Sequence, residues 1–231
     1  MRNVKRIDKP ESLREYADTW TTELMEAIEK FRLEGVPIPK HLPNRYKNDD
    51  VLDALKRMYN DEDGRVYCCY CEAQISVVNY PHIEHRKPKA HDLFPEHTYN
   101  WENLHLACEI CNRAKSTKWD RDNEILDAVS DVPISNHLGY CGGAGGIYRE
   151  TLSNRGITTV IHADLDRPTL RKARMVVYVD TLNTITEIKA LGNNPRAFTA
   201  LRQLKDKCSG VFGSMIKSLL DKFFPENRIT I

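Results

Sequence analysis

The chain has 231 residues, of which 41% are hydrophobic and 29% are charged, with a formal net charge of +1. This composition is typical of a soluble globular protein with one large domain or two small ones. No apolar run approaches the roughly 20 residues that a membrane-spanning helix needs, and the opening residues lack the apolar core of a signal peptide. We therefore expect a cytoplasmic protein that has no membrane partner.

Charge is distributed unevenly along the chain, although its small sum does not indicate nucleic-acid binding. Residues 165–231 hold twelve Lys or Arg against six Asp or Glu, so this part carries +6 and the remainder −5. A basic C-terminal part can meet phosphates or an acidic protein partner. The alternative is a helical face that is simply solvated.

Two amphipathic helices are predicted in the N-terminal helical region, residues 1–64. Apolar residues recur at three- and four-residue steps over 12–34, and a second such pattern covers roughly 49–60. Between them, residues 36–39 contain two prolines and must be extended. This region either caps the core that follows it or serves as a docking arm for a partner protein.

Four of the seven cysteines form two C-x-x-C pairs that are separated by 36 residues. Each pair can present two thiolates to one ion, and four thiolates complete a closed tetrahedral zinc site. The pairs favour a reducing compartment and a structural Zn²⁺ over a disulfide scaffold. The pairs are Cys68/Cys71 and Cys108/Cys111. Three further cysteines are expected to be ordinary buried or small thiols: Cys69, Cys141 and Cys208.

The C-terminal region, residues 126–231, is predicted to contain a β-hairpin followed by helices. Its glycine-rich stretch, 139–146, is interpreted as a flexible turn, because no G-K-[ST] follows it as in a phosphate-binding loop. The segments 146–152 and 156–162 are predicted to pair as the hairpin.

Two helices are predicted after this hairpin. The first has Pro168 in its opening turn and Asp164 or Asp166 as its cap. The last is a long helix from about 195 to 224, whose apolar stripe is interpreted as core or as a subunit interface.

The central segment, residues 65–125, resembles the HNH, or ββα-metal, nuclease superfamily in its zinc-stapled form. Both cysteine pairs carry this resemblance, together with the signature His85, Asn103 and Asn112. In this family a β-hairpin carries an acidic residue followed by His, here Glu84 and His85, and a helix at the second pair carries the third signature residue. The resemblance implies an α+β fold with a zinc-stapled ββα-metal core, N-terminal helices and a C-terminal hairpin-plus-helices region.

The chemistry of phosphodiester hydrolysis suggests a role for each of these residues. We predict His85 as the general base that deprotonates water, because imidazole titrates near neutral pH. Glu84 and Asn112 offer a carboxylate and an amide oxygen, which suit a catalytic Mg²⁺ or Mn²⁺. Asn103 is expected to bond the backbone or the His85 ring. Side chains alternate along a strand, so Glu84 and His85 cannot both reach one ion from an ideal strand, and in the family a bend resolves this.

Several neighbours of these residues can bind substrate phosphates, which requires cations but little geometric precision. Lys115 is the best placed of them, because it lies one turn beyond Asn112 on the same predicted helix. His82 either faces the active site or caps the strand. The candidates are His82, Arg86, Lys89, Arg113 and Lys115.

A narrower resemblance, to the Septu- and retron-associated HNH nucleases called PtuB, touches most of the chain. It is carried by residues 1–6, 83–89 and 99–104. It implies an effector subunit of a bacterial anti-phage defence complex, partnered with an ABC/SMC-like ATPase subunit (PtuA). In retron versions a reverse transcriptase with its RNA–DNA product joins the complex. The chain has no ATP-binding motif, so any nucleotide dependence must come from the partner.

Two other functions are compatible with the sequence. A non-catalytic zinc-finger adaptor would recruit an ATPase or nucleic acid, but it has no use for the acid–base pair Glu84 and His85. A stand-alone restriction or homing-type endonuclease would need its own DNA-reading element, and none is recognisable. The sequence does not distinguish a DNA substrate from an RNA substrate such as tRNA, because hydrolysis at a metal site depends on the phosphate and not on the base.

Overall fold

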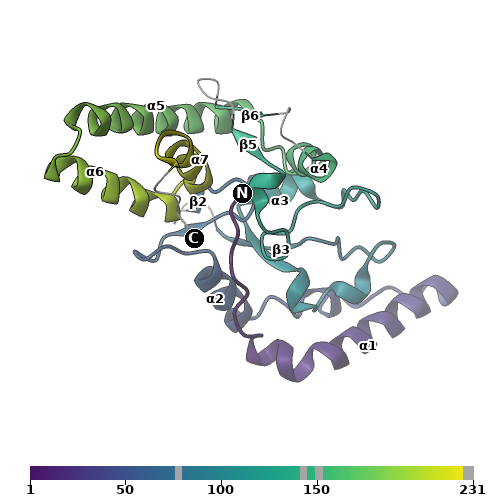
Figure 1. Cartoon of the computed structure of the whole chain (residues 1–231). Coiled ribbons are helices and arrows are strands. Elements are labelled where there is room, and N and C mark those ends of the chain that lie inside the picture. The colour runs from purple at the N-terminus through teal and green to yellow at the C-terminus, as the bar shows by residue number, and fades with distance from the viewer. Residues whose placement is uncertain (76–79, 141–144, 149–152, 226–231) are drawn as a thin grey trace.

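The computed structural model of the chain describes residues 1–75, 80–140, 145–148 and 153–225 (Figure 1). It has a mixed α+β architecture in which the central strands lie between two groups of helices. The N-terminal helices cover one side of these strands, and the C-terminal helices extend from the other side (Figure 1).

The two N-terminal helices form where the apolar pattern predicts them. Helix α1 spans Glu11–Glu34 and ends at Gly35, whose left-handed φ of 72° suits a residue without a Cβ. Helix α2 spans Asp49–Met58 and begins with two aspartates, which the positive end of the helix dipole stabilises. The α1 stripe that packs inward consists of Leu13, Ala17, Leu24 and Ile28.

The central segment contains two antiparallel strand pairs and one helix. Strand β1 (Val66–Tyr67) pairs with β2 (Gln74–Ile75). Strand β3 (His82–His85) pairs with β4 (Leu104–Ala107), and in this register Glu84 lies opposite His105. Helix α3 (Glu109–Lys115) follows β4 and packs against β3. Strands and helix thus follow the order that the HNH resemblance implied.

The C-terminal region contains one short strand pair and four α-helices among its described residues. The strands are β5 (Gly139–Tyr140) and β6 (Ile147–Tyr148). The helices are α4 (Asn154–His162), α5 (Pro168–Leu191), α6 (Pro195–Asp206) and α7 (Gly213–Phe223). Short 3₁₀ helices occur at Leu42–Asn44, Pro95–His97, Trp101–Asn103, Ile134–Asn136 and Lys207–Ser209.

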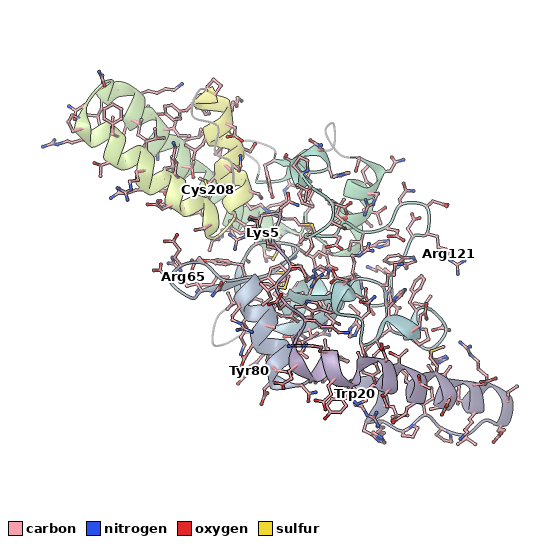
Figure 2. The ribbon with its side chains drawn as sticks, turned by 60° about the horizontal axis from the view of Figure 1, so that its bottom comes forward. Lys5, Trp20, Arg65, Tyr80, Arg121 and Cys208 are labelled. Atoms are coloured by element: carbon pink, nitrogen blue, oxygen red, sulfur yellow. The ribbon has the colours of Figure 1, made fainter. Side chains whose placement is uncertain are left out.

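The buried apolar side chains form two clusters. The larger joins α1 and α2 to the cysteine pairs, to β4 and to residues 125–138. The smaller is formed by α5, α6, α7 and the 3₁₀ helix between α6 and α7, and it includes Ile185, Leu204 and Cys208. Figure 2 shows Cys208 among the C-terminal helices, on the opposite side of the molecule from Trp20 on α1. No helix among the described residues is long and apolar enough to cross a bilayer.

The predicted strand at 156–162 is wrong, because these residues belong to helix α4. Their β-branched run favours a strand, but the Ser153 hydroxyl caps the helix by accepting a bond from the Gly156 N–H at 3.0 Å. The Thr159 hydroxyl also accepts a bond from the buried Leu126 N–H at 2.8 Å. The β6 residues pair with β5 instead, and residues 149–152 lie outside the described ranges.

The predicted cap of α5 is also wrong. The helix begins at Pro168 as expected, but the residue before it, Arg167, occupies the cap position and makes no side-chain cap bond. Asp164 has a φ of 49° and belongs to the preceding turn. Proline supplies a helical φ and needs no N–H partner at this position. The residue at the cap position is thus Arg167 and not Asp164 or Asp166.

The single helix predicted over 195–224 is broken into α6 and α7. Phe212 adopts a left-handed φ of 51° before α7 begins. Gly213 then packs so closely on the preceding turn that a Cβ at this position would lie 1.9 Å from the Cys208 carbonyl oxygen. The apolar periodicity continues through the break, which is why the pattern alone predicts one helix. Cys69 and Cys208 are buried thiols as expected, and Cys141 lies outside the described residues.

The buried bond between Thr159 and Leu126 provides a test of how α4 is held. We expect Thr159→Val to lower the free energy of unfolding by about 1–3 kcal/mol, because the Leu126 N–H loses its acceptor. Thr158 is also buried, but its side chain has no hydrogen bond to any described residue, so Thr158→Val should change stability by about 0.5 kcal/mol at most. Urea unfolding of both variants measures the difference. Equal effects would show that the hydroxyl bond does not hold this helix.

Candidate active site and metal centre

The four cysteines of the two C-x-x-C pairs converge in one cluster. Their sulfur atoms all lie within 4.8 Å of one another, and the Cys71 and Cys108 Sγ atoms are 3.9 Å apart. A tetrahedral site with Zn–S bonds of about 2.3 Å requires sulfur atoms about 3.8 Å apart. Donor type, number and spacing therefore fit a structural zinc ion. The residues that would hold it are Cys68, Cys71, Cys108 and Cys111.

Backbone bonds hold the cysteine pairs in place. The first pair lies between β1 and β2, and the Cys69 N–H donates to the Leu106 carbonyl of β4 at 2.8 Å. The second pair spans the start of α3, which begins at Glu109. The Arg167 guanidinium lies 3.5 Å from the Cys111 sulfur, so the cluster has a positively charged neighbour.

Glu84 lies on β3 with its carboxylate buried. Its Oε1 accepts a bond from the Tyr70 hydroxyl at 3.1 Å and pairs with the Lys115 ammonium at 2.6 Å. Burial raises the pKa of Glu84, and the Lys115 charge acts against this rise. No described residue bonds the second carboxylate oxygen, Oε2. The carboxylate is thus held by one oxygen while the other remains available to a ligand.

His85 is fixed in one tautomer by the backbone. Its Nε2 lies 2.9 Å from the Thr98 carbonyl oxygen, which can only accept, so Nε2 carries the hydrogen. The Tyr46 ring packs edge-on against the imidazole with ring centroids 4.5 Å apart. Burial lowers the pKa of His85 to about 3, so the ring is neutral near pH 7. Its Nδ1 therefore bears a lone pair that can accept a proton.

Asn112 and His82 connect helix α3 to strand β3. The Asn112 Nδ2 lies 3.2 Å from the His82 Nδ1. Because an amide nitrogen only donates, His82 accepts this bond, and the Asn112 Oδ1 is turned away from it. His82 therefore contacts a predicted site residue, and the amide oxygen is left for another partner.

Glu84, His85 and Asn112 line a single cavity of about 630 Å³. The Glu84 side chain contacts α3, whereas the His85 side chain contacts Tyr46 and Thr98, so the two leave the strand toward different neighbours. Within the described residues, the four cysteines are the only group of three or more His, Cys, Asp or Glu ligands close enough to share an ion. A second cation would thus find one carboxylate and one amide, and water would complete its coordination.

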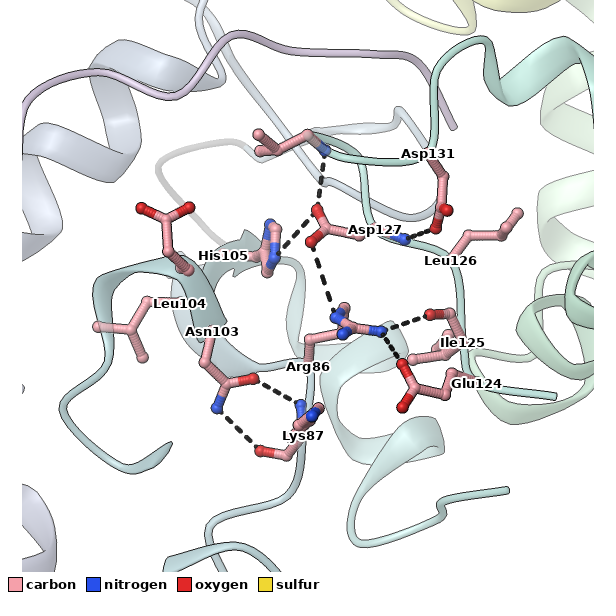
Figure 3. Close-up of polar contacts among 12 residues, drawn as sticks. Arg86, Lys87, Asn103, Leu104, His105, Glu124, Ile125, Leu126, Asp127 and Asp131 are labelled. Atoms are coloured by element: carbon pink, nitrogen blue, oxygen red, sulfur yellow. Dashed lines mark hydrogen bonds and ion pairs between the residues drawn. The ribbon is translucent and has the colours of Figure 1, made fainter. Parts of the chain in front are cut away.

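Asn103 uses its amide to clamp the loop that follows β3. Its Oδ1 accepts from the Lys87 N–H at 2.7 Å, and its Nδ2 donates to the Lys87 carbonyl at 3.0 Å (Figure 3). The same Nδ2 donates to the His97 carbonyl at 3.1 Å. Both donor hydrogens are therefore used within the protein. Two alternatives were expected for Asn103, a bond to the backbone or a bond to the His85 ring. The structure shows the bonds to the backbone.

Arg86 lies in a network of internal ion pairs rather than at an open surface. Its guanidinium is 3.1 Å from the Glu124 carboxylate and 3.7 Å from that of Asp127 (Figure 3). It also lies over the Trp119 ring at 5.5 Å. Asp127 in turn lies 3.6 Å from the His105 Nε2. Arg86 therefore ties the residues after β3 to those around 124–127, and its charge is already balanced.

The other predicted phosphate contacts differ in exposure. The Lys115 side chain is 1% exposed, and its ammonium donates to the His85 carbonyl as well as pairing with Glu84. Arg113 is exposed and pairs with Glu109 on its own helix. Lys89 is half-buried at the cavity, where its ammonium donates to the Pro43 carbonyl at 2.9 Å. Lys115 is therefore already engaged by Glu84 and by the His85 carbonyl. It also lines the cavity, and its contact with phosphate stays a prediction.

Several residues of the site carried no sequence signal. Thr98 acts through its backbone carbonyl, so its side-chain type is uninformative. Tyr46 and Tyr70 lie in different segments and approach His85 and Glu84 only through the fold. The position of Tyr70 between the two cysteines of the first pair is the one sequence feature that could have indicated it.

Removing one cysteine ligand should release zinc and unfold the central segment. We expect Cys108→Ala to lose most of its bound zinc, because the ion's binding free energy is also folding free energy. Cys69→Ala is the matched control, since Cys69 is an adjacent buried thiol outside the cluster. Elemental analysis and circular dichroism measure the two effects. Equal zinc loss in both variants would contradict the four-ligand assignment.

The buried ion pair predicts a large difference between two neighbouring cations. We expect Lys115→Ala to lower the free energy of unfolding by about 3–5 kcal/mol, because Glu84 is left buried and unpaired. Arg113→Ala should cost about 0.5 kcal/mol or less, because its side chain is 78% exposed. Urea unfolding with zinc present compares them. Similar midpoints would show that Lys115 does not neutralise Glu84.

No curated protein matches the chain. Residues 68–118, from the first ligand cysteine to just beyond α3, match the family model described as HNH endonuclease. The matched residues include both cysteine pairs, β3, β4 and α3. This segment of the chain is therefore an HNH endonuclease domain.

Proposed function

We propose that the chain is a metal-dependent endonuclease that hydrolyses phosphodiester bonds, with His85 as its general base. The observation that carries this proposal is the fixed His85 tautomer. With Nε2–H held by the Thr98 carbonyl, Nδ1 is the basic atom, and His85 lines the same cavity as Glu84 and Asn112. A water molecule in this cavity can lose its proton to Nδ1 as it attacks phosphorus.

The other two residues are proposed to hold a divalent cation. Glu84 offers Oε2, and Asn112 offers the amide oxygen that its bond with His82 leaves free. These are hard oxygen donors of the type that Mg²⁺ and Mn²⁺ prefer. When bound, such an ion supplies positive charge to the phosphate oxygens during hydrolysis. Tyr70 and Lys115 hold the Glu84 carboxylate in position for this role.

We further propose that the chain is the effector subunit of a bacterial anti-phage complex of the Septu or retron type, with an ABC/SMC-like ATPase as its partner. The narrower resemblance supports this proposal, and two of the segments that carry it contact each other. The Arg6 guanidinium donates to the Leu104 carbonyl at 2.7 Å and lies over the Trp101 ring at 5.1 Å. In a retron version of the complex, a reverse transcriptase with its RNA–DNA product would be a further partner.

Substitution of the general base tests the catalytic proposal. We expect His85→Ala to lower the rate of nucleic-acid cleavage with Mg²⁺ or Mn²⁺ by about 10²- to 10⁴-fold, because the proton of the attacking water loses its acceptor. His41→Ala, at an exposed histidine outside the cavity, should cleave like the wild type. Zinc content and circular dichroism establish that both variants are folded. Unchanged cleavage by folded His85→Ala would overturn the assignment.

The same variant tests the defence role in cells. When it is expressed with its neighbouring genes, His85→Ala should lose protection against phage while still purifying with the ATPase subunit. A non-catalytic adaptor would retain protection in this variant. A chain that is monomeric and fully active alone would instead indicate a stand-alone endonuclease.

A further inference from the structure

We propose that the cavity beside His85 binds one unpaired nucleotide of the substrate, so that the enzyme cuts single-stranded or looped nucleic acid in preference to continuous duplex. This inference rests on the proposed nuclease function and specifies its substrate class. It is carried by the apolar floor of the cavity, by an aromatic rim and by lysines at the edge.

The floor of the cavity is apolar and comes from the N-terminal region. Leu24 and Ile28 contribute from α1, and Ile38 contributes from the segment after it. A volume of about 630 Å³ lies within the usual range for small-molecule sites, which is roughly 300–1,000 Å³. Apolar walls do not suit the phosphate backbone of a duplex, but they suit the flat face of an unstacked base.

The rim presents an aromatic ring on which a base can stack. His91 lines the cavity and is exposed, and Phe31 packs edge-on against its ring with centroids 5.5 Å apart. The Arg32 guanidinium donates to the His91 carbonyl at 2.5 Å, which holds the loop against α1. Stacking on aromatic side chains is a general means of binding unpaired bases without reading their sequence.

Cations lie where the strand must enter. Lys40 and Lys89 both line the cavity, and Lys40 is exposed and forms no ion pair with any described residue. The one carboxylate in the lining, Glu84, is already paired with Lys115. The edge of the cavity therefore carries an excess of positive charge, which complements the phosphates on either side of a bound nucleotide.

A second cavity continues the path beyond the catalytic residues. It has a volume of about 430 Å³ and shares Tyr46, Ile83 and Asn112 with the first. Lys47 lies in its wall. A strand whose base occupies the first cavity can thus pass Asn112 and leave through the second. In a duplex the base stays stacked and paired, so the enzyme would first have to extrude it at a cost of a few kcal/mol.

The test compares one labelled oligonucleotide sequence as a single strand, as a duplex and as a duplex interrupted by an unpaired loop. DNA and RNA versions form separate arms, which distinguish the two sources of an unpaired nucleotide. With Mg²⁺ or Mn²⁺ we expect cleavage of the single strand and the loop to be roughly tenfold or more faster than that of the duplex. Equal cleavage of duplex and single strand would overturn the proposal.

Variants at the rim of the cavity distinguish nucleotide binding in the cavity from general electrostatic attraction. We expect His91→Ala and Lys40→Ala to weaken single-strand binding. The loss of stacking in His91→Ala should raise the Kd for the single strand by roughly 5- to 100-fold. Duplex binding should change little. Lys30→Ala, at an exposed lysine of α1 outside the cavity, is the matched control. If a rim variant weakened duplex binding and single-strand binding by the same factor, the cavity would not be a site for an unpaired nucleotide.

Binding is measured by fluorescence anisotropy with His85→Ala protein, so that the substrate stays intact. A preference for the single strand that disappears in the rim variants supports the pocket, even if no nucleic acid is cleaved by the wild type. In that case the proposed catalytic function fails while the binding site stands. Cleavage without any preference for the single strand would instead support the catalytic function and overturn the binding pocket.

Discussion

The four-thiol cluster is the constraint on which the rest of the central segment depends. It joins Cys71 to Cys108, which are 37 positions apart in the chain, and β3 lies between them in sequence. Because β3 pairs with β4, and β4 leads directly into the second cysteine pair, closing the cluster brings β3 beside α3. The bonds of Glu84 to Lys115 and of His82 to Asn112 bridge these two elements.

The interior of this segment is more polar than an ordinary protein core. Glu84 and Lys115 are buried as a pair, and Arg86 is held between the Glu124 and Asp127 carboxylates. Buried ion pairs contribute little net stability, because desolvation offsets their attraction. They fix geometry instead, and a metal ion that stabilises the fold can compensate for a small apolar core.

The N-terminal helices complete the site as well as the core. Residues of α1 and of the segment after it form the apolar side of the cavity whose other side carries His85. The C-terminal helices α5, α6 and α7 instead pack mainly on one another, around a second cluster of buried side chains that includes Leu204. One end of the chain therefore shapes this cavity. The other end adds a group of helices beyond the central strands (Figure 1).

The sequence by itself determined the cysteine cluster, the strands and helix around it, α1 and α2, because spacing and periodicity are local properties. Only the tertiary structure decided that residues 156–162 form a helix, since a cap and a buried bond to Leu126 outweigh strand propensity there. It also decided the environment of Lys115 and the tautomer of His85, which depend on a carboxylate and a carbonyl from other segments. A backbone carbonyl is common to every residue type, so no sequence pattern could reveal that Thr98 orients the His85 ring.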